Sequence, residues 1–108
     1  MPADHQLFLD AIAAKRRISV RFKHPKEVRE MVCTCAPLDF GPLRGSKDPE
    51  PRYQLWDLDA KRRPFNLALR ASEILELKLL ETFDPSAIIT WAFKPGAWAI
   101  PRDWAEFS

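Results

Sequence analysis

The feature that most constrains the fold is a change of hydrophobic periodicity early in the chain. Before it, Leu7, Phe8, Ala11 and Ile12 recur at helical spacing and form one apolar stripe. After it, apolar and polar residues alternate through 18–23, as in a strand with one buried face. The sequence therefore predicts a short helix lying on the face of a β-sheet.

The helix is expected to begin after Asp4 and to run to about Arg17. The Asp4 carboxylate is placed to cap the free amides of the first turn. Lys15, Arg16 and Arg17 would lie in the last turn, where positive charge suits the helix dipole. Opposite charges are therefore expected to mark the two ends of this helix.

Four further segments are candidate strands. They are residues 28–36, 52–59, 65–70 and 72–83. Pro37 removes a backbone donor, so the chain from Pro37 to Phe40 is expected to bend or bulge. Residues 41–51 hold two glycines and three prolines, which predicts an exposed loop.

The segment 72–83 permits two interpretations. Its glutamates, leucines and lysine favour a helix, which Ser72 could cap. Leu75, Leu77 and Leu79, however, alternate with charged residues, as in a strand with one wet face. We predict a strand here because of the family resemblance described below.

The 108 residues have room for one core, so a single domain is expected over 1–108, with its core at about 4–84. The C-terminal extension, 85–108, differs in composition because it is rich in aromatic residues and proline. Its large aromatic residues are Trp91, Phe93, Trp98, Trp104 and Phe107. Rings of this size are rarely left in water, so the extension is expected to pack on this domain or on a partner.

Hydropathy and cysteine usage predict a reduced, cytoplasmic protein. No apolar run is long enough to span a bilayer, and the N-terminus does not resemble a signal peptide. Cys33 and Cys35 would lie on one face of a strand, a poor arrangement for bridging each other. They could supply two thiolate ligands to zinc, or act as two small buried hydrophobes. Since His5 and His24 lack ligand spacing, no metal and no cofactor are expected.

No motif in the chain predicts an enzyme. A glycine-rich phosphate loop and a nucleophile elbow are both missing from the sequence. Asp57 and Asp59 fall on one face of a candidate strand and could share acid–base work, or form a turn and ion pairs beside Lys61. The turn is the better interpretation, so no catalytic residue is predicted.

Basic side chains are better candidates for a site. Residues 1–29 hold seven Lys and Arg against three acids, a net charge of +4, whereas residues 73–108 hold three against six, or −3. Four arginines also flank the candidate strands among aromatic residues. They are Arg29, Arg52, Arg63 and Arg70, interleaved with Tyr53 and Trp56. Such a group suits a phosphate, a carboxylate or a stacked base, and would otherwise be the wet face of an amphipathic sheet.

The order of these features resembles the WYL domain family. The matching segments are Ile18 to Phe22, Arg29 to Val32 with Pro37 and Leu38, Tyr53 to Asp59, Arg63 to Leu67, and Ile74 to Phe83. Together with the helix they span roughly residues 7–84. Three positions depart from the family pattern, since Tyr53 replaces a tryptophan, Gln54 a tyrosine and Asn66 an arginine.

The resemblance implies a mainly β (α+β) fold. An N-terminal helix would precede a strongly bent, five-stranded antiparallel sheet that closes as an Sm-like small β-barrel, followed by the aromatic and proline-rich extension. Family members are mostly bacterial transcription regulators, commonly with a helix-turn-helix domain in front of the WYL domain. A DNA-reading domain of that kind is not expected in this sequence.

The resemblance also implies a ligand-sensing role. The expected module binds an anionic ligand, either a nucleotide or single-stranded nucleic acid, and acts through a regulatory partner protein or as a homo-oligomer. The candidate ligand-binding residues are Arg29, Tyr53, Arg63, Asn66 and Arg70. The alternative is a protein–protein interaction module that docks through its aromatic C-terminal tail and binds no small ligand.

Overall fold

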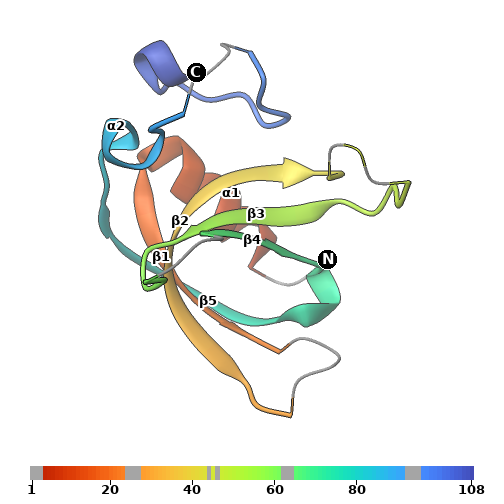
Figure 1. Ribbon diagram of the computed structural model, residues 1–108. Helices are drawn as coiled ribbons and strands as arrows, with labels where there is room; N and C mark the ends of the chain where they lie inside the picture. Colours follow the sequence, from red (N-terminus) through yellow and green to blue (C-terminus); the bar gives the residue numbers. More distant parts are fainter. Residues whose placement is uncertain (1–3, 24–27, 44, 46, 62–64, 92–95) are drawn as a thin grey trace.

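The strands of the described chain form one five-stranded antiparallel sheet, with a short helix against it (Figure 1). The computed structural model describes residues 4–23, 28–43, 45, 47–61, 65–91 and 96–108. In chain order the elements are α1 (His5–Ala14), β1 (Arg16–Phe22), β2 (Met31–Gly41), β3 (Arg52–Asp57), β4 (Asn66–Leu69), the 3-10 turn η1 (Ala71–Glu73), β5 (Ile74–Thr82), α2 (Pro85–Ile88) and the 3-10 turn η2 (Ala105–Phe107). The predicted α+β class, with a helix before five antiparallel strands, is confirmed. Among the described helices, none has the length and apolar character needed to cross a membrane.

The sheet is open. Its strand order is β4-β3-β2-β1-β5, so β4 and β5 are the two edges, and no ladder joins them among the described residues. β2 curves along its length and carries the sheet around the helix (Figure 1). The predicted closure into a small barrel is therefore not seen in the part of the chain that the structure describes.

The helix ends earlier than the sequence predicts. α1 stops at Ala14, and Lys15 adopts a left-handed conformation with a φ of 55° while its amide bonds back to the helix. Arg16 then starts β1 and pairs with Thr82 of β5. The prediction of a helix to Arg17 is wrong. Arg16 and Arg17 belong to β1, because pairing with β5 outweighs their helix propensity.

Asp4 precedes the helix as predicted, but its carboxylate does not cap the first turn. Its Oδ2 accepts a hydrogen bond from the backbone amide of Leu77 at 3.0 Å. The side chain therefore ties the start of α1 to β5. The helix buries Phe8, Ala11 and Ile12, which belong to the stripe that its spacing predicts.

The bend predicted after Pro37 is a bulge within β2. Pro37 pairs with Leu55 of β3 and Asp39 pairs with Gln54, so Leu38 is the extra residue. The strand continues through the bulge, past its predicted end. Because a bulge changes which side chains face inward, Asp39 is buried beside its apolar neighbours.

The ambiguous segment 72–83 contains a strand, as predicted. Ser72 lies in η1, and β5 follows it. A bulge opposite β1 leaves Leu75 without a partner in register, so Ile74 and Leu77 are buried while Leu75 is exposed. Leu79 is exposed as well, so of the three alternating leucines only Leu77 is buried.

The C-terminal extension packs on this domain through Trp104. The indole is 1% exposed and meets Phe83 edge to face, with 5.6 Å between ring centroids. Its Nε1 donates to the backbone oxygen of Ile12 at 2.7 Å. Ile88 and Ile89, at the end of α2, also belong to the buried core. The predicted packing on the domain is confirmed for these residues, in the blue segment of Figure 1.

Candidate ligand-binding pocket

Tyr53, a predicted ligand-binding residue, is a core residue in the structure. Its ring is fully buried beside Phe8 and Phe40, with centroids 4.9 and 4.6 Å away. Its hydroxyl oxygen lies 2.7 Å from Nδ1 of His5. Burial raises the pKa of Tyr53 to about 12. A ligand could therefore stack on this ring only if the core opened.

Arg70 is held by carboxylates near the start of β3. Its Nη1 lies 2.8 Å from Oε1 of Glu50, and its Nη2 lies 3.0 Å from Oδ2 of Asp48. Asp48 also lies 3.2 Å from Nη2 of Arg52. We call these four residues the Arg70 network. A hydrogen bond from the Glu50 amide, and then the two guanidinium groups, lower the pKa of Asp48. An anionic ligand at Arg70 would have to compete with two carboxylates.

The other predicted residues have separate positions. Arg29 is exposed in the connection between β1 and β2, and Arg63 lies outside the described residues. Asn66 is exposed at the start of β4, where it pairs with Trp56 of β3. Of the predicted residues that the structure describes, Asn66 is the one that lines the cavity described next.

A cavity of about 750 Å³ lies between β3, β4 and the C-terminal extension. Its aromatic lining residues are Trp56, Phe65, Trp91 and Trp98. The rest of the described lining is aliphatic, apart from Thr90 and the side-chain amides of Gln54 and Asn66, and none of it is charged. A concave, mostly apolar site with a few polar groups is typical of small-molecule binding sites.

Trp56 is the centre of the aromatic wall. Its ring stacks on Trp91, with 5.4 Å between centroids and 30° between planes. Phe65 lies 5.3 Å from it at 34°. Trp91 is 42% exposed, so part of its surface remains open to solvent. The wall therefore offers flat surface on which a planar group can stack.

Two primary amides supply polar groups to the cavity. Gln54 donates from Nε2 to the backbone oxygen of Gly41 at 3.2 Å, which leaves its Oε1 as an acceptor. The Asn66 side chain makes no hydrogen bond to another described residue. An amide carries both a donor and an acceptor, the combination that pairs with the edge of a nucleobase.

A second cavity of about 370 Å³ adjoins the first. Leu43, Gln54 and Trp98 line both cavities. The second is bounded on one side by the end of β2 and on the other by Ala97 and Ala99 of the extension. The C-terminal extension therefore contributes a wall to both.

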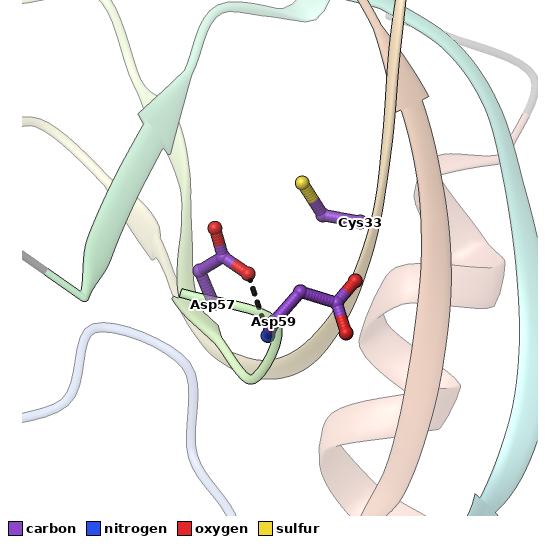
Figure 2. A group of neighbouring side chains, drawn as sticks. All are labelled: Cys33, Asp57 and Asp59. Atoms are coloured by element: carbon purple, nitrogen blue, oxygen red, sulfur yellow. Dashed lines mark hydrogen bonds between the residues drawn. The ribbon is translucent and has the colours of Figure 1, made fainter. Parts of the chain in front are cut away.

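Cys33, Asp57 and Asp59 lie together where β3 ends beside β2 (Figure 2). Their potential ligand atoms lie within 4.8 Å of one another. Oδ2 of Asp59 accepts from the amide of Thr34 at 2.8 Å, and Oδ1 of Asp57 accepts from the amide of Asp59 at 2.9 Å. These bonds close the turn after β3 onto β2, and they account for both aspartates as turn residues.

Among the described residues, these three side chains are the group whose potential ligand atoms lie close enough together to hold a metal ion. Burial, followed by the charges of Asp57 and Asp59, raises the pKa of Cys33 to about 11. Burial is also the main cause that raises the pKa of Cys35. Both thiols are free, buried and protonated at neutral pH, so they pack as small hydrophobes.

Comparisons with known proteins do not place the chain in a family. No family model, no curated protein and no solved structure matches it. The resemblance to the WYL domain family therefore stays a prediction based on the order of sequence features.

Most residues of the cavity wall were not predicted as site residues. Trp91 and Trp98 were visible as aromatic residues of the extension, but the surface on which they pack was not. Gln54 was noted as a departure from the family pattern, and Trp56 as a neighbour of arginines. In the sequence, the sign of this site was a primary amide, Gln54, close to an aromatic ring, Trp56, on the same strand. Long-range packing decides which other rings join them.

Proposed function

We propose that this protein is a regulatory binding module that holds a nucleotide or short single-stranded nucleic acid, with a base in the cavity beside Trp56. The observation that carries the proposal is the combination of stacked aromatic rings with the amides of Gln54 and Asn66 in one cavity. Aromatic faces stack on any base, and amides hydrogen-bond to base edges. The volume of about 750 Å³ suits a ligand of this size.

The base contributes more to binding than the phosphate in this proposal. The described lining of the cavity is uncharged, and Arg70 is already paired with Asp48 and Glu50. The anionic part of the ligand therefore stays at the mouth of the cavity. Arg63 remains the predicted phosphate contact, and it lies outside the described residues.

The WYL resemblance supplies the wider setting of the proposal. An Sm-like arrangement of the five strands is supported by the strand order, in which β1 lies between β2 and β5, and by the curvature of β2, although the sheet is open among the described residues. A reduced, cytoplasmic setting is supported by the two free cysteines. Output would pass through a partner protein or a second copy of the chain.

Tryptophan fluorescence provides the test, because Trp56 and Trp91 line the cavity. The probes are AMP, GMP, CMP and UMP, the nucleosides adenosine and uridine, inorganic phosphate, and an eight-residue oligothymidylate. We expect nucleosides to bind, monophosphates to bind more tightly through Arg63, and inorganic phosphate alone not to bind. Asn66→Ala should weaken binding about fivefold, as for one lost hydrogen bond, and Trp91→Ala about tenfold, as for one lost stack.

Arg21→Ala is the matched control. Arg21 is a partly exposed arginine of β1 that pairs with Glu30 and Glu76, so its removal should leave affinity unchanged. The proposal is overturned if none of the nucleosides, monophosphates or oligothymidylate binds at millimolar concentration. It is also overturned if Asn66→Ala and Trp91→Ala bind the probes as tightly as the wild type does.

A protein–protein interaction module is the second candidate. It is favoured by Trp91, whose ring is 42% exposed. Trp104, in contrast, is used inside the domain and is not available to a partner. If Trp91 docks on a second copy, light scattering should show a dimer that Trp91→Ala converts to a monomer. A monomeric wild type would contradict self-association.

A further inference from the structure

A buried carboxylate on β2 anchors the end of the chain. Oδ2 of Asp39 accepts a hydrogen bond from the amide of Ala99 at 2.9 Å, and Oδ1 accepts from the amide of Ile100 at 3.0 Å. The bulge in β2 places Asp39 in this position, where it is 7% exposed. Both carboxylate oxygens are therefore engaged by residues 96–108, which we call the strap.

Arg102 of the strap meets the charge of Asp39 inside the protein. Its side chain is 0% exposed, and its Nη2 lies 3.3 Å from Oδ1 of Asp39. The guanidinium carbon lies 4.1 and 4.5 Å from the ring centroids of Trp98 and Trp104, and Nη1 donates to the backbone oxygen of Leu38. Burial lowers the pKa of Arg102 to about 10, so the group stays protonated at neutral pH.

A charged anchor makes the strap easier to release than an apolar one of the same size. Burying an ion pair removes water from both ions, and this cost offsets much of their mutual attraction. When the strap leaves, Asp39 and Arg102 both recover their hydration. The pair therefore specifies where the strap docks, while the net free energy of docking comes largely from burial of Trp104.

The strap also builds the pocket. Trp98 lines both cavities, and its Nε1 donates to the backbone oxygen of Phe107 at 2.7 Å, so its orientation depends on the strap itself. The strap crosses the end of β2 at close range, because a Cβ added to Gly41 would lie 3.2 Å from Cβ of Ala99. Release of the strap would remove one wall of each cavity.

We propose that docking of the strap and occupancy of the pocket are coupled equilibria. A bound base favours the docked strap, and an empty pocket favours its release. This inference rests on the proposed function. A ligand that contacts Trp98 binds the docked state more tightly than the released state, so it shifts the population toward docking. The coupling is reciprocal, because the factor by which the ligand favours docking equals the factor by which docking favours ligand binding.

Amide hydrogen exchange of the wild-type protein tests the coupling directly. The amides of Ala99 and Ile100 donate to Asp39 only while the strap is docked, so their exchange reports its release. The probe is AMP, or whichever of GMP, CMP and UMP binds more tightly. At ten times its Kd, the probe should slow exchange of both amides about tenfold.

Arg102→Met provides the converse test, because methionine keeps apolar volume but removes the charge. We expect faster exchange at Ala99 and Ile100, and weaker binding of the probe in proportion to the loss of docked molecules. The matched control is Arg21→Met, on an arginine outside both cavities, which should change neither. If Arg102→Met does not fold, the wild-type exchange measurement decides alone.

The outcomes separate the two proposals. Binding of the probe with unchanged exchange at Ala99 and Ile100 would overturn the strap and leave the proposed function standing. Equal affinity of the wild type and an Arg102→Met variant in which both amides exchange as fast as in an unstructured peptide would do the same. Failure of every probe to bind would overturn both.

Discussion

Two ion pairs in this molecule join an arginine to an aspartate in opposite environments. The side chains of Arg102 and Asp39 are 0% and 9% exposed, whereas those of Arg70 and Asp48 are 42% and 34% exposed. The N–O distances are similar, at 3.3 and 3.0 Å. If one partner of the exposed pair is removed, water solvates the charge that remains. If one partner of the buried pair is removed, the remaining charge stays buried without a partner.

The comparison teaches that position, rather than residue type, decides what an arginine does. Arg70 ends a candidate strand and belongs to the group of arginines interleaved with Tyr53 and Trp56, and it was therefore predicted to bind a ligand. Arg102 lies in the extension and was not predicted to have any role. In the structure Arg102 holds the strap from a buried position, and Arg70 belongs to a partly exposed network.

The largest effect is expected for Arg102→Ala. It should lower the free energy of unfolding by about 3–5 kcal/mol, because Asp39 would keep a buried charge without its partner. Urea denaturation measures the change. The double variant Arg102→Ala with Asp39→Asn should recover part of the loss, since it removes the stranded charge. An Arg102→Ala protein as stable as the wild type would show that the pair is not buried in solution.

A smaller effect is expected for Trp104→Phe. The change keeps an aromatic ring but removes the indole donor, which leaves the backbone oxygen of Ile12 unpaired in the core. The free energy of unfolding should fall by about 2 kcal/mol. Trp91→Phe, on a ring that is 42% exposed, should change it by less than about 0.5 kcal/mol. Equal losses for the two variants would contradict the docking of Trp104.

Arg70→Ala should have a still smaller effect, below about 1 kcal/mol, because its partners are partly exposed. Salt sharpens the contrast with Arg102, since it screens exposed pairs far more than buried ones. The cost of Arg70→Ala should shrink in 1 M NaCl, measured again by urea denaturation. The cost of Arg102→Ala should hardly change. A cost of Arg70→Ala above that of Arg102→Ala would reverse the comparison.

The smallest effect is the acid dependence of the Arg70 network. The pKa of Asp48 is below its ordinary value of 3.8 in the folded protein, so the folded state favours the charged form. Its contribution to stability is fully present above pH 3.8 and is lost as the pH falls through the lower, folded-state pKa. The difference in unfolding free energy between the wild type and Asp48→Asn should therefore decline below that pH. A constant difference from pH 6 to pH 2 would contradict it.

Local patterns predicted most of the sheet. Ile18, Val20 and Phe22 alternate in the sequence and are all buried in β1. The predictions failed where pairing partners decide the outcome. Arg16 and Arg17 joined β1 instead of the helix, because β5 pairs with the start of that strand. Bulges depend on two strands at once, so neither strand shows them by itself.

The candidate site was less predictable than the fold. Asn66 lines the cavity, but Tyr53 is enclosed by the core and Arg70 is paired with carboxylates. Strand periodicity indicates the face on which a residue lies. It does not indicate which residues from distant segments share that face, and the cavity needs Trp98 from the extension beside Gln54 from β3.

The sequence by itself determined that a short amphipathic helix precedes a β-sheet and that an aromatic extension must be covered. Both follow from periodicity and hydrophobicity, which act between near neighbours or on a single side chain. Only the tertiary structure decided that the sheet stays open among the described residues and that Asp39 faces inward to meet Arg102. Those outcomes depend on bulges and on contacts between residues more than sixty positions apart, such as Asp39 and Ile100, whose separation is 61. No local pattern contains that information.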